Sequence, residues 1–309
     1  MRVDHWFKNV FAIPGAILAV TVGRDVPLDD LVPRLFFATC SLCLISSSNY
    51  IANEILDAPT DLAHPSKAQR PVPSGRVHVR LAWVQWVLTM IAGIALSTLV
   101  GTEFAMAMGA LWIMGCVYNM PPLRTKDVPY LDVLSESINN PLRLFAGWYA
   151  VDPGIVPPGS LQLSYWMVGA YFMAVKRYAE YRFIQDPKRA ATYRASFAHY
   201  SEERLLTSIL FYAASAMLFF GIFIARYRLE LILGFPFVAW TMAAYLHVGT
   251  AHDSAAQRPE KLYREPLVVT AVAACTAVIL LCLVVDAPWL DAVIGVFPRA
   301  DYRPLSTGG

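Results

Sequence analysis

Charged residues are scarce in this sequence: Asp, Glu, Lys and Arg make up 16% of its 309 residues, where about 25% is usual in soluble domains. Hydrophobic residues make up 57%, against about 45–50% in soluble domains. One soluble globule of this size cannot bury so much apolar surface, which excludes a soluble domain and a disordered chain. The net charge of +2 is too small to indicate a nucleic-acid partner. The composition therefore predicts an integral membrane protein.

Cysteine is also rare, because the chain has only five cysteines and all of them lie within apolar stretches. This excludes a secreted domain that is held together by disulfides. Cys40 and Cys43 form a C-x-x-C pair, which we interpret as small apolar side chains on a membrane helix. We also expect no cleavable signal peptide, since no small-residue cleavage site follows the first apolar run.

Long apolar runs, by contrast, fill most of the chain. A helix needs about 20 mostly apolar residues to cross the hydrocarbon core of a membrane. We predict an all-α fold: a polytopic membrane bundle of about nine transmembrane helices around a cavity that is open to the cytoplasmic side, in a single domain over residues 1–309. The predicted spans are 10–22, 31–52, 79–100, 104–118, 131–150, 161–175, 205–225, 229–248 and 267–285.

Lys and Arg are concentrated in alternate loops. The long loops at about 57–78, 177–204 and 250–266 are rich in both, whereas the loops between them are short and poor in charge. Cytoplasmic loops of membrane proteins carry an excess of Lys and Arg. We therefore expect a bacterial-type inner membrane, a cytoplasmic N-terminus and an outer C-terminus, with any chemistry at the cytoplasmic face.

An amide and two carboxylates stand four residues apart at the end of the second predicted span: Asn53, Asp57 and Asp61. On a helix this spacing places them on one face, with Pro59 as a candidate break before Asp61. Such oxygen ligands suit Mg²⁺, which proteins hold by one or two carboxylates together with substrate phosphates. The motif therefore predicts a magnesium–diphosphate site.

Two cations, Lys67 and Arg70, follow this motif closely. They are candidate partners for phosphate oxygens. The alternative interpretation is a solvated helix end whose cations are ordinary charges of a cytoplasmic loop.

The fifth predicted span carries a second polar group. Asp132, Glu136 and Asn140 repeat the four-residue spacing, and Arg143 follows them on the same side. Ionisable residues inside a membrane are expensive and usually functional. The alternative is a structural ion pair of Arg143 with Glu136 or Asp132. Lys126, in the loop before this span, is within reach of the same face.

The sixth predicted span ends in a basic segment, which reads Lys176-Arg177-Tyr178-Ala179-Glu180-Tyr181-Arg182. Its three cations fit a phosphate group better than a metal ion, although they also fit the cytoplasmic end of a span. Arg264, at the entry to the ninth predicted span, is a further candidate for substrate binding, or else a solvated loop residue.

The string Asn-x3-Asp-x3-Asp followed by His-Pro-x-Lys-x2-Arg-Pro resembles the UbiA-type prenyltransferase superfamily, and so does Trp6-Phe7-Lys8-Asn9. The resemblance extends over most of the chain. It implies an intramembrane transferase with an all-helical bundle of nine spans. It also implies that the first motif, Asn53, Asp57 and Asp61, holds Mg²⁺ and the diphosphate of the donor.

Within that superfamily, the basic segment and the His-Pro-Ser-Lys string are most similar to the branch that includes decaprenyl-phosphate phosphoribosyltransferase. This resemblance implies transfer of 5-phosphoribose from phosphoribosyl diphosphate, a soluble donor, to a polyprenyl phosphate, a lipid acceptor. Glu54 departs from the branch, which usually has Asp at that position. The oligomeric state is left open, and no nucleic-acid partner is expected.

On this hypothesis the catalytic residues are Asp57, Asp61, Asp132 and Glu136. The substrate-binding residues are Asn53, Lys67, Arg70, Lys126, Arg143, Lys176, Arg177, Glu180, Arg182 and Arg264. One alternative is prenyl transfer from a polyprenyl diphosphate to an aromatic or other small acceptor, for which the first motif would be the same. A remote alternative is a transporter, which the clustering of polar residues at one membrane face and the lack of an inverted repeat disfavour.

Overall fold

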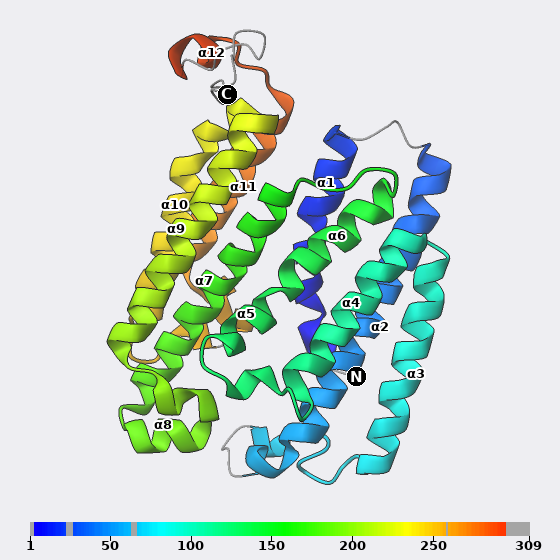
Figure 1. The fold of residues 1–309 in the computed structure, drawn as a ribbon, viewed down its shortest axis with the longest axis vertical. Coiled ribbons are helices and arrows are strands. Elements are labelled where there is room, and N and C mark those ends of the chain that lie inside the picture. Colours follow the sequence, from blue (N-terminus) through cyan, green and yellow to red (C-terminus); the bar gives the residue numbers. More distant parts are fainter. Residues whose placement is uncertain (1–2, 23–26, 63–66, 258, 295–309) are drawn as a thin grey trace, which may run out of the picture.

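The computed structural model describes residues 3–22, 27–62, 67–257 and 259–294. These residues form helices and no β-strand (Figure 1), which confirms the predicted all-α class. The helices are α1 (Ile13–Val22), α2 (Leu28–Asp61), α3 (Val79–Thr98), α4 (Thr102–Asn119), α5 (Leu131–Ser137), α6 (Asn139–Val151), α7 (Gly159–Ile184), α8 (Pro187–Tyr193), α9 (Glu202–Tyr227), α10 (Phe235–Gly249), α11 (Pro266–Val284) and α12 (Trp289–Ile294). Short 3₁₀ segments join them: η1 (Val3–Ala12), η2 (Lys67–Gln69), η3 (Thr125–Asp127), η4 (Ala195–His199), η5 (Leu229–Gly234), η6 (Ala255–Gln257) and η7 (Pro259–Arg264).

The helices divide into two flanking groups and a middle group. In Figure 1, α9, α10 and α11 form one side of the molecule and α2, α3 and α4 the other, with α1, α5, α6 and α7 between them. Helix α2 packs along α3, α1 along α6, and α7 along α9. The helices that carry the second and third polar groups of the sequence therefore lie in the middle of the bundle.

Five helical segments of the described chain are long and apolar enough to cross a membrane by themselves: α2, α3, α9, α11 and the continuous stretch Leu229–Gly249. Each of the nine predicted spans overlaps helical chain, but the count of nine spans stays a prediction. Helices α5 and α6, with 7 and 13 residues, are too short to cross a membrane by themselves. Helix α7 is long enough, but its last turns carry charged side chains, of which Arg177 is buried in the bundle.

Helix α2 continues through Pro59 and ends at Asp61. A proline inside a helix removes one backbone hydrogen bond, but here the last turn is still closed by a bond from the Leu62 N–H to the Ala58 carbonyl, at 3.2 Å. The expected break before Asp61 is therefore absent. As a result, the amide and the two carboxylates of the first motif lie on one uninterrupted helix.

Helices α1 and α6 approach each other closely through a pair of glycines. A methyl group built on Gly147 would overlap the carbonyl oxygen of Ala12, and one built on Gly15 would overlap the carbonyl oxygen of Leu144. Small residues allow such close packing of helix backbones in membranes. This contact fixes the position of α6 along α1. It therefore also fixes the position of Arg143, which lies one turn before Gly147 on α6.

We expect Gly147→Ala to destabilise the protein by about 1–3 kcal/mol, because the added methyl group must push two backbones apart. The matched control is Gly109→Ala on α4, where an added methyl group meets nothing within 4 Å. Thermal unfolding in detergent compares the two variants. Equal stability of the two would contradict the close contact between α1 and α6.

Candidate active site

The first motif lies at the end of α2, where basic side chains surround its carboxylates. Asp57 Oδ1 lies 2.5 Å from Lys126 Nζ and 3.1 Å from Arg124 Nη2. Asn53 Nδ2 donates to the other oxygen of Asp57, at 3.2 Å. Because Asp57 keeps 21% of its side chain exposed, this ion cluster is accessible to a ligand.

The loop after α4 supplies the cations of this cluster. Arg124 has a left-handed backbone, with φ of +31°, which is uncommon for a residue other than glycine. This conformation turns its side chain toward Asp57 and also toward Asp127, which lies 2.7 Å from Arg124 Nε. Burial lowers the pKa of Lys126, while the charge of Asp57 acts in the opposite direction. The loop therefore holds two cations against one carboxylate.

Asn119 joins the two halves of the cluster. Its Oδ1 accepts hydrogen bonds from Asn53 Nδ2 at 2.6 Å and from Lys126 Nζ at 3.1 Å. Sequence reasoning missed Asn119, because a single amide at a helix end carries no pattern of its own. Its place beside the first motif emerges only when α4 packs against α2.

Asp61 lies one turn beyond Asp57 and contacts a different cation, Arg70, whose Nη1 is 2.5 Å from Asp61 Oδ2. The turn that carries Arg70 is tied back to α2, since Val72 N donates to Glu54 Oε1 at 2.8 Å. Asp61 and Arg70, which were predicted to bind Mg²⁺ and phosphate respectively, thus form an ion pair with each other in this structure. The side chain of Lys67 lies outside the described residues.

A second ion cluster lies deeper, between α5 and α7. Arg177 Nε donates to Asp132 Oδ2 at 3.1 Å, and Arg177 Nη1 donates to Glu180 Oε2 at 2.9 Å. The side chain of Asp132 is fully buried and that of Arg177 is 3% exposed. Each charge is compensated within the cluster, as buried charges in proteins must be.

The segment after α8 completes the shell around Asp132. Tyr200 Oη donates to Asp132 Oδ1 at 2.7 Å, and Ser196 Oγ donates to Oδ2 at 3.1 Å. Arg194 Nη1 lies 3.7 Å from Asp132 Oδ2 and also donates to the Lys126 carbonyl at 3.4 Å. Arg194 therefore connects the two ion clusters. No spacing along the chain connects these residues with Asp132, so their contacts could not be predicted.

The second polar group does not lie on a single helix, as its spacing predicted. Helix α5 ends at Ser137 and α6 begins at Asn139, with Ile138 between them. Arg143 is buried on α6, and its Nη1 donates to the carbonyl of Asn139, at 3.3 Å. Neither of the ion pairs considered for Arg143, with Glu136 or with Asp132, forms within 4 Å among the described residues. The cation that pairs with Asp132 is Arg177.

The remaining predicted cations lie in different environments. Lys176 Nζ is 3.9 Å from Glu180 Oε1. Arg182 points away from the ion clusters: it contacts Glu202 at 3.4 Å, donates to the Thr250 carbonyl at 2.8 Å and stacks on the ring of Tyr178. The structure therefore brings Lys176, Arg177 and Glu180 together and separates Arg182 from them.

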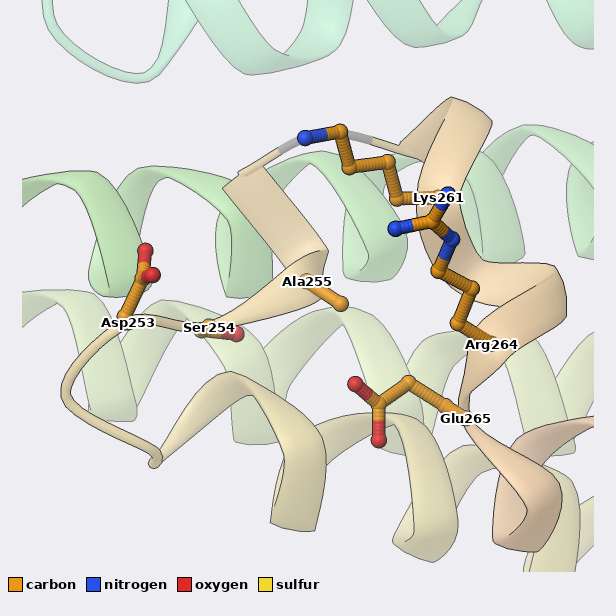
Figure 2. A pocket seen from close by; sticks show the side chains of 6 residues that line it. All are labelled: Asp253, Ser254, Ala255, Lys261, Arg264 and Glu265. Carbon is orange, nitrogen blue, oxygen red and sulfur yellow. The ribbon is translucent and has the colours of Figure 1, made fainter.

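Arg264 lies in a separate small pocket between α10 and α11, shown in Figure 2. The pocket has a volume of about 150 Å³ and is also lined by Lys261, Asp253 and Glu265. Arg264 Nε contacts the hydroxyl of its neighbour Tyr263, at 3.0 Å. Within the described chain, Arg264 makes no hydrogen bond or ion pair with the first motif or with the Asp132 cluster.

The donor set at the end of α2 fits Mg²⁺ only together with a substrate. In the part of the chain that the structure describes, no group of three or more His, Cys, Asp and Glu side chains could hold a metal ion. Asp57 and Asp61 offer two carboxylates and Asn53 an amide, which matches the way Mg²⁺ binds through one or two carboxylates and phosphate oxygens. Lys126 and its neighbour Arg124 can form ion pairs with the phosphate oxygens of that substrate.

The sequence is similar to a known protein family and to several of its members. The family described as UbiA prenyltransferase family matches residues 9–265. A decaprenyl-phosphate phosphoribosyltransferase of Mycolicibacterium smegmatis is 28% identical over 206 residues, which are 66% of this chain and 62% of that protein. The enzyme of that name from Mycobacterium tuberculosis is 25% identical over 72% of this chain and 71% of its own length. The chain thus spans less than two thirds of the first of these relatives.

Solved structures show the same fold. A UbiA homolog from Archaeoglobus fulgidus bound to DMAPP and Mg²⁺ superposes with a TM-score of 0.66 at 19% identity, over 89% of this chain and 96% of that one. A UbiA homolog from Aeropyrum pernix gives a TM-score of 0.65 at 18% identity, over 91% and 98% of the two chains. At this level of identity, the similarity concerns the arrangement of the helices.

Proposed function

We propose that this chain, which belongs to the UbiA prenyltransferase family, transfers 5-phosphoribose from phosphoribosyl diphosphate to a polyprenyl phosphate in a Mg²⁺-dependent reaction. Membership in the family indicates a transferase. The observation that carries the proposal is the ion cluster at the end of α2, where Lys126, Arg124 and Arg70 face Asp57 and Asp61. The similarity to decaprenyl-phosphate phosphoribosyltransferases supports the choice of donor.

The chain is a multi-pass membrane protein, as its apolar helices and its family indicate. We propose that it forms one domain in a bacterial inner membrane, with the end of α2 at the cytoplasmic face. The excess of Lys and Arg in the loops on that side supports this orientation. A soluble diphosphate then reaches the site from the cytoplasm, and a lipid reaches it from the membrane.

The cations of the site recognise the diphosphate of the donor. Lys126 and Arg124 leave one oxygen of Asp57, and Arg70 leaves Asp61, to contact phosphate oxygens, since hydrogen bonds between charged groups are the strong ones. Asp57 and Asp61 would then hold Mg²⁺ beside the diphosphate, which neutralises the charge of the leaving group. When no phosphate is bound, the same cations form ion pairs with Asp57 and Asp61. The charges of the carboxylates are therefore compensated both before and after each turnover.

In the reaction, the bond between C1 of the ribose and the diphosphate oxygen breaks, and its electron pair leaves with the diphosphate. An oxygen of the lipid phosphate forms the new bond to C1. This oxygen is already anionic near neutral pH, so no side chain has to remove a proton. Lys126 and Arg70 stabilise the charge that develops on the leaving group, as preorganised donors do in other transfer reactions.

A carboxylate near C1 would stabilise the positive charge that the sugar develops. Of the two acids predicted for this role, Glu136 is the better candidate. Asp132 is fully buried and already accepts hydrogen bonds from Arg177, Ser196 and Tyr200. We therefore assign to Glu136 the stabilisation of the charge on the sugar in the transition state. To Asp132 we assign a structural role in holding the side chains around it.

A second candidate function is prenyl transfer from a polyprenyl diphosphate to a small acceptor. It is favoured by the similarity in fold to a UbiA homolog bound to GPP and Mg²⁺. The same carboxylates would hold the same magnesium–diphosphate unit. The nature of the donor therefore distinguishes the two functions.

The test uses the purified full chain in nanodiscs, with phosphoribosyl diphosphate labelled in the ribose and a polyprenyl phosphate. We expect a labelled lipid that forms with Mg²⁺, disappears with a chelator and returns when Mg²⁺ is added in excess. Release of diphosphate from a polyprenyl diphosphate and a small acceptor, without any labelled lipid in the first assay, would instead support prenyl transfer.

A further inference from the structure

Arg143 is a buried cation without an acidic partner. Only 7% of the residue is exposed. Its two hydrogen bonds are long and go to neutral oxygens, Asn9 Oδ1 at 3.4 Å and the Asn139 carbonyl at 3.3 Å. Within the described chain, no carboxylate lies within 4 Å of its guanidinium. A charge buried in this way is costly unless an opposite charge joins it.

Lys8 lies on the same side of the bundle as Arg143. Its ammonium group stands over the ring of Tyr50, 5.4 Å from the ring centre. The next residue, Asn9, accepts hydrogen bonds from Ser46 on α2, at 3.0 Å, and from Arg143 on α6. Segment η1 is therefore fixed between α2 and α6, and it brings a second cation to the buried region around Arg143.

Lys176 is the third cation of this region. It shares Glu180 with Arg177, but its distance to that carboxylate is 3.9 Å, whereas Arg177 makes a hydrogen bond of 2.9 Å. Electrostatic interactions link Lys176, Lys8 and Arg143 with Glu136. The three cations thus come from η1, α6 and α7, and each of them, like Arg177, lies within electrostatic range of Glu136.

The charges of this group do not balance. Lys8, Arg143 and Lys176 contribute three positive charges, and Glu136 contributes one negative charge, which leaves a net charge of +2. The neighbouring cluster does not change this sum, because Arg177 and Arg194 are matched by Asp132 and Glu180. The group therefore needs about two negative charges from a ligand.

We propose that Lys8, Arg143 and Lys176 bind the phosphate monoester of the lipid acceptor. A phosphate monoester carries about −1.5 to −2 charges near neutral pH, which matches the excess of the group. The identification of the ligand rests on the proposed function. This anion site is distinct from the end of α2, where the diphosphate of the donor binds.

The depth of the site fits a lipid head group. Tyr50 precedes Asp57 by seven residues on α2, which corresponds to about 10 Å along the helix axis. Lys8, over the ring of Tyr50, therefore lies farther into the bundle than the donor site. A lipid phosphate at this depth would leave its chain within the apolar part of the membrane, while the soluble donor stays at the surface.

The test separates the binding of the acceptor from that of the donor. Lys8→Met and Lys176→Met each remove one charge and keep the length of the side chain. We expect each variant to raise the KM for polyprenyl phosphate about tenfold or more, with the KM for the donor changed less than twofold. The control is Arg226→Gln in the last turn of α9, where the cation stacks on the ring of Tyr227. This variant should change neither KM value.

A binding measurement without donor makes the test independent of turnover. Labelled polyprenyl phosphate should bind the unchanged protein more tightly than the polyprenol that lacks the phosphate, and Lys8→Met should remove this difference. If one of the two Met variants does not fold, the test uses the other one together with Lys8→Arg. Lys8→Arg keeps the positive charge and should bind polyprenyl phosphate nearly as well as the unchanged protein.

Equal binding of the phosphate and the alcohol by the unchanged protein would overturn the anion site. A rise in the KM for the donor, with the KM for the acceptor unchanged, would also overturn it. If polyprenyl phosphate binds through Lys8 and Lys176 but phosphoribosyl diphosphate gives no product, the proposed function fails and the anion site remains.

Discussion

Replacement of Asp57 by Asn is expected to lower the rate of transfer by about 10²–10³-fold, the size of effect seen when one preorganised charge-stabilising group is lost. Asp57 is the residue on which Lys126, Arg124 and Asn53 converge. The Asn variant keeps the shape of the side chain but loses the negative charge that orients the two cations and that, in the proposed function, binds Mg²⁺. Initial rates of lipid labelling with saturating donor and acceptor measure the effect.

The control for this variant is Asp29→Asn on the same helix. Asp29 lies in the first turn of α2, at the end away from the cluster, so its replacement should leave the rate within twofold. Full activity of Asp57→Asn, or an equal loss in both variants, would show that the end of α2 does not bind the leaving group.

Replacement of Asp132 by Leu is expected to destabilise the protein by about 3–5 kcal/mol, because the removal of one partner leaves a buried charge without compensation. Arg177 would retain Glu180 but lose its bond to Asp132, and Tyr200 and Ser196 would lose their acceptor. Thermal unfolding in detergent should show the loss. Proteolysis should also cleave the segment after α8 sooner than in the unchanged protein.

An exposed ion pair provides the comparison. Glu202 lies 3.4 Å from Arg182, with 55% and 39% of the two side chains exposed. Exposed pairs of this kind contribute about 0–1 kcal/mol, so Glu202→Gln should unfold nearly at the temperature of the unchanged protein. If Asp132→Leu unfolds as late as Glu202→Gln does, Asp132 does not support the site in the way described.

Much of the fold was predictable because the constraint is simple. Long apolar runs in a membrane must form helices, since every backbone polar group has to find its partner within the segment. The family was also predicted correctly from the string around Asn53 and Asp57. The break at Ile138 was not predictable, because the four-residue spacing from Asp132 to Asn140 continues across it. The continuation of α2 past Pro59, where the Leu62 N–H still bonds to the Ala58 carbonyl, was not predicted either.

The site was predictable where neighbouring residues in the sequence cooperate, and not where distant loops meet. Asp61 and Arg70 stand nine residues apart, and both were singled out as site residues, although their ion pair was not predicted. Arg177 and Asp132 were both singled out, but their pairing required α5 and α7 to lie together. Arg194 reaches Asp132 from another loop. No periodicity in the chain encodes such contacts.

The bond from Val72 to Glu54 has a consequence for how this sequence can change over time. Pro71 and Pro73 lack backbone N–H groups, so Val72 supplies the one main-chain donor of this tripeptide, and Glu54 accepts it. Because the main chain makes the bond, the bond itself excludes only proline at position 72, although the buried apolar surroundings of Val72 still favour an apolar side chain there. The residue at 54 has no such freedom: an aspartate, shorter by one methylene group, would reach the donor only if the turn that carries Arg70 moved toward α2. Lineages with Asp at this position should therefore show a compensating change in the turn.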